Sequence, residues 1–112
     1  MSVLLSAELE LFLYMEIEMQ EKLNQIRNDI DAIDDQIVPL LAKRIGLALE
    51  ASRYKHTVAE VQSCDRVKMV LGSVAERTRK VDGNADAIVD IYSFIIQKLT
   101  EMQLQEKGLI EK

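Results

Sequence analysis

Residues 23–44 read LNQIRNDIDAIDDQIVPLLAKR, and the spacing of their apolar residues predicts the architecture. These residues recur at alternating steps of three and four, at Leu23, Ile26, Ile30, Ile33, Ile37 and Leu40. This period is typical of a helix that packs lengthwise against another helix. Pro39 lies inside the pattern without shifting its phase. We therefore expect a continuous helix with a kink near Asp35 rather than two separate helices.

Arg44 occupies the next position of this apolar series. A charge at a packed position destabilises a protein unless it is paired, so its presence needs an explanation. Either the side chain serves a binding site, or the apolar stripe turns outward at this point and Arg44 is simply solvated.

Residues 44–55, RIGLALEASRYK, favour a binding site. If the helix continues to residue 55, the eleven steps from Arg44 to Lys55 make three turns and about 20° more, so both cations point the same way. Ala48 and Ala51 lie between them on the same stripe and leave a gap. Arginine forms paired hydrogen bonds with a carboxylate, and lysine supplies a point charge. The pattern therefore predicts a site for a small dicarboxylate.

The length of this helix predicts an oligomer. A helix from about residue 21 to residue 55 would be roughly 52 Å long. A compact domain of about 100 residues has a radius of gyration near 13 Å, so the helix would extend beyond any domain that one chain builds around it. We therefore expect an intertwined homo-oligomer, most simply a two-fold dimer.

Three further polar residues are candidates for the site. Arg27 lies about 100° away from the Arg44 stripe, so it cannot serve that site in its own subunit, although in an antiparallel dimer it could reach the partner's site. Arg66 falls in the first turn of the next predicted helix, where the helix dipole disfavours a cation, and this placement indicates a role in anion binding. Gln103 shares the apolar line of the last helix and would face a groove. Alternatively, it is an exposed residue near a fraying helix end.

The rest of the chain predicts two more helices. HTVAEVQSCD, residues 56–65, lacks a helical apolar repeat and is expected to be a loop. The second helix, capped near Ser63 or Asp65, has an apolar face of Val67, Val70, Leu71, Val74 and Val81. Residues 82–84 form a turn, and the third helix begins at Asn84 as N-cap and ends before Gly108. Its apolar face comprises Ile88, Ile91, Tyr92, Ile95, Ile96, Leu99 and Met102.

The composition agrees with a small all-α protein. The chain has 112 residues, of which 48% are hydrophobic, with one proline and four glycines. Its net charge of -5 argues against a general nucleic-acid binder. The lone Cys64 fits a reducing compartment, and no residues have the spacing of a metal site.

The first twenty residues are apolar but carry several glutamates, so they match neither a secretory signal nor a membrane span. We expect a helical extension over residues 1–20 that packs on the protein or on a partner. The domain itself would span residues 21–108. We expect a cytoplasmic protein that does not associate with membranes.

Together these segments resemble the all-helical, type II chorismate mutase family over roughly residues 23 to 106. The resemblance rests on IRNDIDAID from Ile26, on the LLAKR arginine, on RYK and DRV, and on the late Gln103. It implies a three-helix fold whose long first helices pair antiparallel in an intertwined homodimer. It implies pericyclic chemistry that requires neither a cofactor nor a metal.

The resemblance also implies roles for the candidate residues. Arg27 of the partner subunit and Arg44 would bind a substrate carboxylate. Lys55 and Gln103 would reach the ether oxygen that joins the enolpyruvyl group to the ring. Arg66 would correspond to the loop arginine of the family.

Two positions depart from the true mutases. Val67 replaces a glutamate that reads the ring hydroxyl of the substrate, and Leu99 replaces a serine four residues before the final glutamine. Both make the pocket less polar, and together with the ASRYK string they resemble the isochorismate pyruvate-lyase branch. We expect isochorismate to be split into salicylate and pyruvate, with weak mutase activity. The alternatives are a chorismate mutase that forms prephenate, a mutase for an amino-substituted chorismate, and a non-catalytic helical interaction protein.

Overall fold

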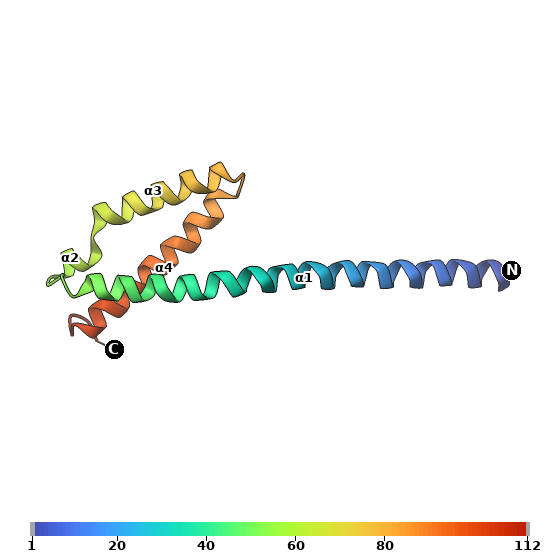
Figure 1. Cartoon of the computed structure of the whole chain (residues 1–112), viewed down its shortest axis with the longest axis horizontal. Coiled ribbons are helices and arrows are strands. Elements are labelled where there is room, and N and C mark those ends of the chain that lie inside the picture. The colour runs from blue at the N-terminus through green and yellow to red at the C-terminus, as the bar shows by residue number, and fades with distance from the viewer. Residues whose placement is uncertain (1, 112) are drawn as a thin grey trace. The chain divides into compact units, whose positions relative to one another are not determined.

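The computed structural model describes residues 2–111, and the side chains of residues 6–111. Its four helices are α1 (Ser2–Ser52), α2 (Val58–Gln62), α3 (Cys64–Lys80) and α4 (Ala85–Glu106), and the described residues include no strand (Figure 1). The predicted all-α class with a long first helix is therefore confirmed. The three predicted helices are α1, α3 and α4, and α2 is additional.

Helix α1 is continuous through Pro39, as predicted. It also crosses residue 20 without interruption, so no change of secondary structure marks the end of the predicted extension, whose residue 1 lies outside the described residues. Among the described residues, no helix is both long and apolar enough to span a membrane.

The predicted helix end at residue 55 is wrong, because α1 stops at Ser52. The next three amides hydrogen-bond to carbonyls only three residues back: Arg53 to Glu50 (3.1 Å), Tyr54 to Ala51 (3.1 Å) and Lys55 to Ser52 (3.0 Å). This is the tighter 3₁₀ pattern, in which helices commonly terminate. Lys55 therefore lies on a turn and not on the α-helical stripe of Arg44.

The chain divides into two compact units, one up to Ala42 and the other from Lys43. The first unit consists of α1 alone, and the described side chains of residues 6–40 are all exposed. The apolar seam, defined as Leu23, Ile26, Ile30, Ile33, Ile37 and Leu40, is 40% to 67% exposed. Most helical stability in proteins comes from packing of an apolar face, and the expected homodimer, in which another helix would cover this seam, stays a prediction.

The second unit contains the packed core. Helices α3 and α4 contact each other, and Figure 1 shows the turn that joins them; α2 also contacts α4. The buried apolar side chains among the described residues are Val61, Val74, Leu99 and Leu104.

Helix α2 corrects the predicted loop at residues 56–65. The Thr57 side chain caps this helix by accepting a hydrogen bond from the Glu60 amide (3.1 Å). The Glu60 carboxylate in turn accepts one from the His56 amide (2.6 Å). Thr-x-x-Glu is the sequence pattern of a capping box and was the signal for this helix. A five-residue helix is too short to show an apolar period, which is why the periodicity missed it.

The predicted start of α3 near Ser63 is confirmed in position. Ser63 both ends α2 and precedes α3, with a left-handed backbone at φ 46°. Its hydroxyl donates to the Glu60 carbonyl and does not cap α3. At the other end, Val81 lies just beyond the helix and is 76% exposed, so its predicted place on the apolar face is wrong.

Both predicted ends of α4 are confirmed. The Asn84 side chain caps the helix by accepting a hydrogen bond from the Ala87 amide (3.0 Å). At the far end, Gly108 adopts φ 71°, and its amide donates to the Gln105 carbonyl (3.0 Å). The Leu109 amide donates to the Leu104 carbonyl (2.9 Å), which completes a Schellman motif. Ile91, predicted for the apolar face, is 55% exposed.

Candidate active site

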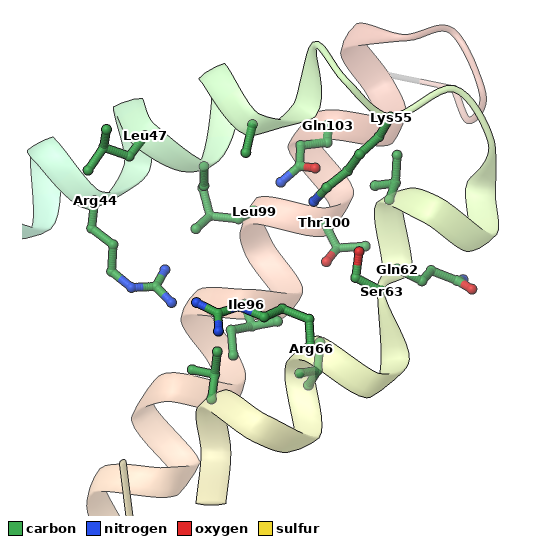
Figure 2. A pocket seen from close by; sticks show the side chains of 15 residues that line it. Arg44, Leu47, Lys55, Gln62, Ser63, Arg66, Ile96, Leu99, Thr100 and Gln103 are labelled. Atoms are coloured by element: carbon green, nitrogen blue, oxygen red, sulfur yellow. The ribbon is translucent and has the colours of Figure 1, made fainter. Parts of the chain in front are cut away.

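A cavity of about 320 Å³ lies in the second unit and is lined by residues of all four helices and of the turn after α1 (Figure 2). Its volume is in the range of small-molecule sites. Eight of the nine predicted site residues line it: Arg44, Ala48, Ala51, Lys55, Arg66, Val67, Leu99 and Gln103. The structure thus brings these eight residues together, while their roles in binding and catalysis stay predictions.

The geometry that brings Arg44 and Lys55 together differs from the prediction. Arg44 projects from α1, whereas Lys55 projects from the turn that follows it. Ala48 and Ala51 line the cavity along α1, as the stripe predicted. Figure 2 shows Arg44 and Lys55 at opposite ends of the cavity, each extending into it from the α1 side. The alternative of a solvated Arg44 is wrong, because this side chain is half-buried and lines the cavity.

Three cations face the cavity, and no acidic residue lines it. The guanidinium groups of Arg44 on α1 and Arg66 on α3 extend toward each other, while the Lys55 amine lies near the Gln103 amide (Figure 2). The ion pairs among the described side chains are Lys22–Glu18 and Lys80–Glu76, so no carboxylate neutralises the three cations. The uncompensated positive charge suits an anionic ligand with acceptors at both ends.

A larger hollow in the same unit shows why charge and not size identifies the site. This hollow of about 680 Å³ is lined by Glu50 and Glu106 together with Arg53 and Lys107. Its acidic and basic side chains balance each other, so it has no net attraction for a dianion. The smaller cavity, with three cations and no acid, is therefore the candidate active site.

Gln103 is the most deeply buried polar residue of the cavity, at 4% exposed. Its side-chain oxygen Oε1 has no hydrogen-bond partner among the described residues. A buried polar atom without a partner destabilises a protein by about 1–3 kcal/mol, so a donor group of a ligand that reached this oxygen would stabilise the site. The alternative of an exposed residue at a fraying helix end is wrong.

The wall between the polar groups is apolar. Val67 from α3 and Leu99 from α4 both line the cavity, and Leu99 is 5% exposed. Val61, Val70 and Ile96 extend the same wall. The side chains of this wall carry neither a carboxylate nor a hydroxyl.

Sequence reasoning missed several lining residues. On α4, Ile96 and Thr100 precede Gln103 by one or two turns, and the helical period could have identified them. Gln62 and Ser63 could not be identified in this way, because they belong to the segment that was predicted to be a loop. Leu47 lies one residue before Ala48 and joins the α1 side of the cavity.

Arg27 is the one predicted site residue that does not line the cavity. It belongs to the first unit and is exposed. Its role in a partner's site stays a prediction.

Comparison with known families gives one match. The family model of chorismate mutase type II matches residues 26–104, which is more than half of the chain. The matched segment includes the seam of α1 from Ile26 onward, every residue of the cavity and Arg27. No curated protein matches the chain.

Proposed function

The chain belongs to the type II chorismate mutase family, and on this basis we propose that it is an isochorismate pyruvate-lyase, with weak chorismate mutase activity. The observation that carries the choice of branch is the apolar wall of Val67 and Leu99. A mutase that recognises the ring hydroxyl of chorismate has polar groups at these two positions. Loss of such a partner weakens discrimination for a substrate that needs it.

The cationic side chains of the cavity bind the two carboxylates of the substrate. Arg44 and Arg66 approach the same end of the cavity, where their planar guanidinium groups hold carboxylate oxygens through paired hydrogen bonds. Arg27 of the partner subunit adds a third guanidinium in this proposal. Binding at both carboxylates folds the enolpyruvyl side chain over the ring, which is the conformer that reacts.

Lys55 and Gln103 act on the ether oxygen. In the lyase reaction the ether bond to the ring breaks while a ring hydrogen moves to the enolpyruvyl methylene carbon. The ring becomes aromatic as salicylate, and the side chain leaves as pyruvate. Negative charge develops on the ether oxygen, and the Lys55 amine and the Gln103 amide, which lie near each other, stabilise it (Figure 2). The reaction is intramolecular, so it uses no external oxidant or base.

The dimer is part of this proposal. Six large apolar side chains of the seam are exposed on α1, and two copies related by a two-fold axis would cover each other's seams. Antiparallel pairing would bring Arg27 of one subunit to the cavity of the other. Each cavity would then gain the cation that its own chain does not supply.

The second candidate activity is rearrangement of chorismate to prephenate, or of an amino-substituted chorismate to its product. Membership of the family favours this activity. Lys55 and Gln103 at the ether oxygen, and Arg44 and Arg66 at the carboxylates, would serve the rearrangement as well as the lyase reaction. A non-catalytic role is less compatible with three uncompensated cations around a buried amide without a partner.

The test is incubation of the purified protein with isochorismate and with chorismate in separate reactions. Salicylate fluorescence follows the first reaction, and prephenate formation follows the second. We expect salicylate from isochorismate at a kcat/KM well above that for prephenate formation. Prephenate as the main product would move the chain to the mutase branch. No product and no change in melting temperature with either compound would favour the interaction protein.

A further inference from the structure

Tyr92 lies behind the candidate active site and contacts one of its cations. The Cζ atom of Arg44 is 5.5 Å from the centroid of the Tyr92 ring, which is within the range of a cation–π interaction. Tyr92 is half-buried on α4 and does not line the cavity. We propose that Tyr92 is a positioning residue whose ring holds the Arg44 guanidinium ready for the substrate carboxylate.

Arg44 needs such a support. Its long side chain has many rotamers, and the described residues provide it with neither an ion pair nor a side-chain hydrogen bond. An unsupported guanidinium would lose its rotational freedom when the carboxylate binds, and this loss weakens binding. An aromatic face attracts the cation without neutralising its charge. The ring can therefore orient Arg44 and still leave its donors free for the substrate.

The position of Tyr92 follows from the helical period of α4. Tyr92, Ile96, Leu99 and Gln103 recur at steps of four, three and four and lie on one face of the helix. The last three line the cavity, and Tyr92 continues the same face one turn beyond it. One face of α4 therefore places the amide, the apolar wall and the ring in series, with the ring at the Arg44 end.

Tyr92 also has a packing role that any test must separate from positioning. It borders an apolar hollow between α3 and α4 together with Val74 and Ile88. A substitution that removes the ring could therefore loosen the α3–α4 contact without acting on Arg44. The ring and not the hydroxyl makes the cation–π contact, so Tyr92→Phe is the conservative variant and Tyr92→Leu is the disruptive one.

The first experiment measures the orientation of Arg44 directly and does not depend on which substrate the enzyme uses. NMR relaxation of the Arg44 Nε–Hε group gives its order parameter in the free protein. We expect the order parameter to fall in Tyr92→Leu and to stay at the wild-type value in Tyr92→Phe. The resonance of the Hε proton should also lose its ring-current shift in Tyr92→Leu alone. An unchanged Arg44 signal in Tyr92→Leu overturns the proposal, even if the proposed lyase activity is correct.

The second experiment rests on the proposed function and uses a double-mutant cycle. We expect Tyr92→Leu to raise the KM for isochorismate by about three- to thirtyfold with little change in kcat, and Tyr92→Phe to stay within about twofold. In an Arg44→Ala background, the added Tyr92→Leu substitution should not change the KM, because the guanidinium that Tyr92 positions is absent. Effects that multiply in the double variant, or equal losses in the Phe and Leu variants, overturn the positioning role. If the chain turns over neither isochorismate nor chorismate, the proposed function fails and the NMR result alone decides on Tyr92.

Discussion

The apolar seam of α1 and the cavity of the second unit both depart from the usual rule that apolar side chains are buried and polar side chains are exposed. The seam exposes six large aliphatic side chains on a helix that stands alone in its unit. The cavity, in contrast, is lined by the half-buried Arg44 and Lys55, by an apolar wall and by the buried amide of Gln103. In the proposed dimer a second copy covers the exposed apolar residues, and in the proposed function a ligand binds the polar residues of the cavity.

The two regions lack different kinds of contact. The seam lacks apolar contacts, and a second copy of the same helix can supply them. The cavity lacks counter-charges, which a small dianion can supply, and a hydrogen-bond donor for Oε1 of Gln103, which a hydroxyl group of a ligand can supply. Arg27 links the two regions, because it lies beside the seam and, in the proposed dimer, completes the cavity of the other subunit.

The largest effect is expected from a charge placed in the seam. Ile33→Asp removes a large apolar side chain from each subunit, and the two losses together weaken the dimer by about 3–6 kcal/mol before the repulsion of the new charges is added. Sedimentation velocity should show a monomer at micromolar concentration. Gln36→Asp, a substitution of an exposed residue off the seam, is the matched control and should stay dimeric. A dimeric Ile33→Asp variant would contradict the assigned interface.

The next effect is expected inside the cavity. Lys55→Ala removes the main stabiliser of charge on the ether oxygen, a loss of about 3–4 kcal/mol, so kcat should fall at least a hundredfold. Steady-state kinetics measures this, and circular dichroism should show unchanged helicity. Lys98→Ala changes an exposed α4 lysine outside the cavity and should keep full activity. Near-normal activity of Lys55→Ala would remove the proposed mechanism.

A substitution at the α3–α4 turn tests the packing that holds the cavity walls. A Cβ atom at Gly83 would lie 2.8 Å from Cγ2 of the buried Thr78, so Gly83→Ala should lower the free energy of unfolding by about 1–3 kcal/mol. Gly72→Ala is the control within α3, where an added Cβ meets nothing within 4 Å. It should raise the stability by about 0.5–1 kcal/mol. Urea unfolding measures both, and an equal response of the two variants would contradict this packing.

The smallest effect is expected on selectivity. Val67→Glu places a carboxylate on the apolar wall, where it can accept a hydrogen bond from the ring hydroxyl of chorismate. The ratio of kcat/KM for chorismate to kcat/KM for isochorismate should therefore rise by about tenfold, which corresponds to the free energy of one good hydrogen bond. Val67→Leu keeps the wall apolar and should leave the ratio unchanged. Parallel assays with both substrates measure this ratio. A carboxylate that does not alter it would show that residue 67 does not read the ring hydroxyl.

Much of the fold could be predicted because its signals are local. The step of three and four identified α1 through Pro39, and Asn84 and Gly108 marked the two ends of α4. The end of α1 could not be predicted from the apolar period, since the 3₁₀ turn at residues 53–55 depends on hydrogen bonds that leave no trace in that period. Helix α2 had a signal, the Thr57 capping box, but no periodicity to support it.

Site residues could be predicted from the sequence where a polar side chain interrupted a series of apolar ones. Arg44 stood in an apolar series, and Gln103 stood on an apolar face, so both were conspicuous. The contact between Arg44 and Tyr92 was not predictable in this way, because it joins α1 to α4 and an aromatic residue on an apolar face breaks no rule. Contacts between distant segments of this kind become visible only in the folded chain.

The most direct test of a site shared between subunits is complementation between two inactive variants. Arg27→Ala and Lys55→Ala are each expected to lose activity, and the two proteins are then unfolded together and refolded as a mixture. Half of the dimers carry one chain of each kind, and one of their two cavities then has both Arg27 and Lys55 intact. The mixture should therefore recover about one quarter of the wild-type activity. Activity no higher than that of the separate variants, in a mixture shown to contain mixed dimers, would contradict the shared site.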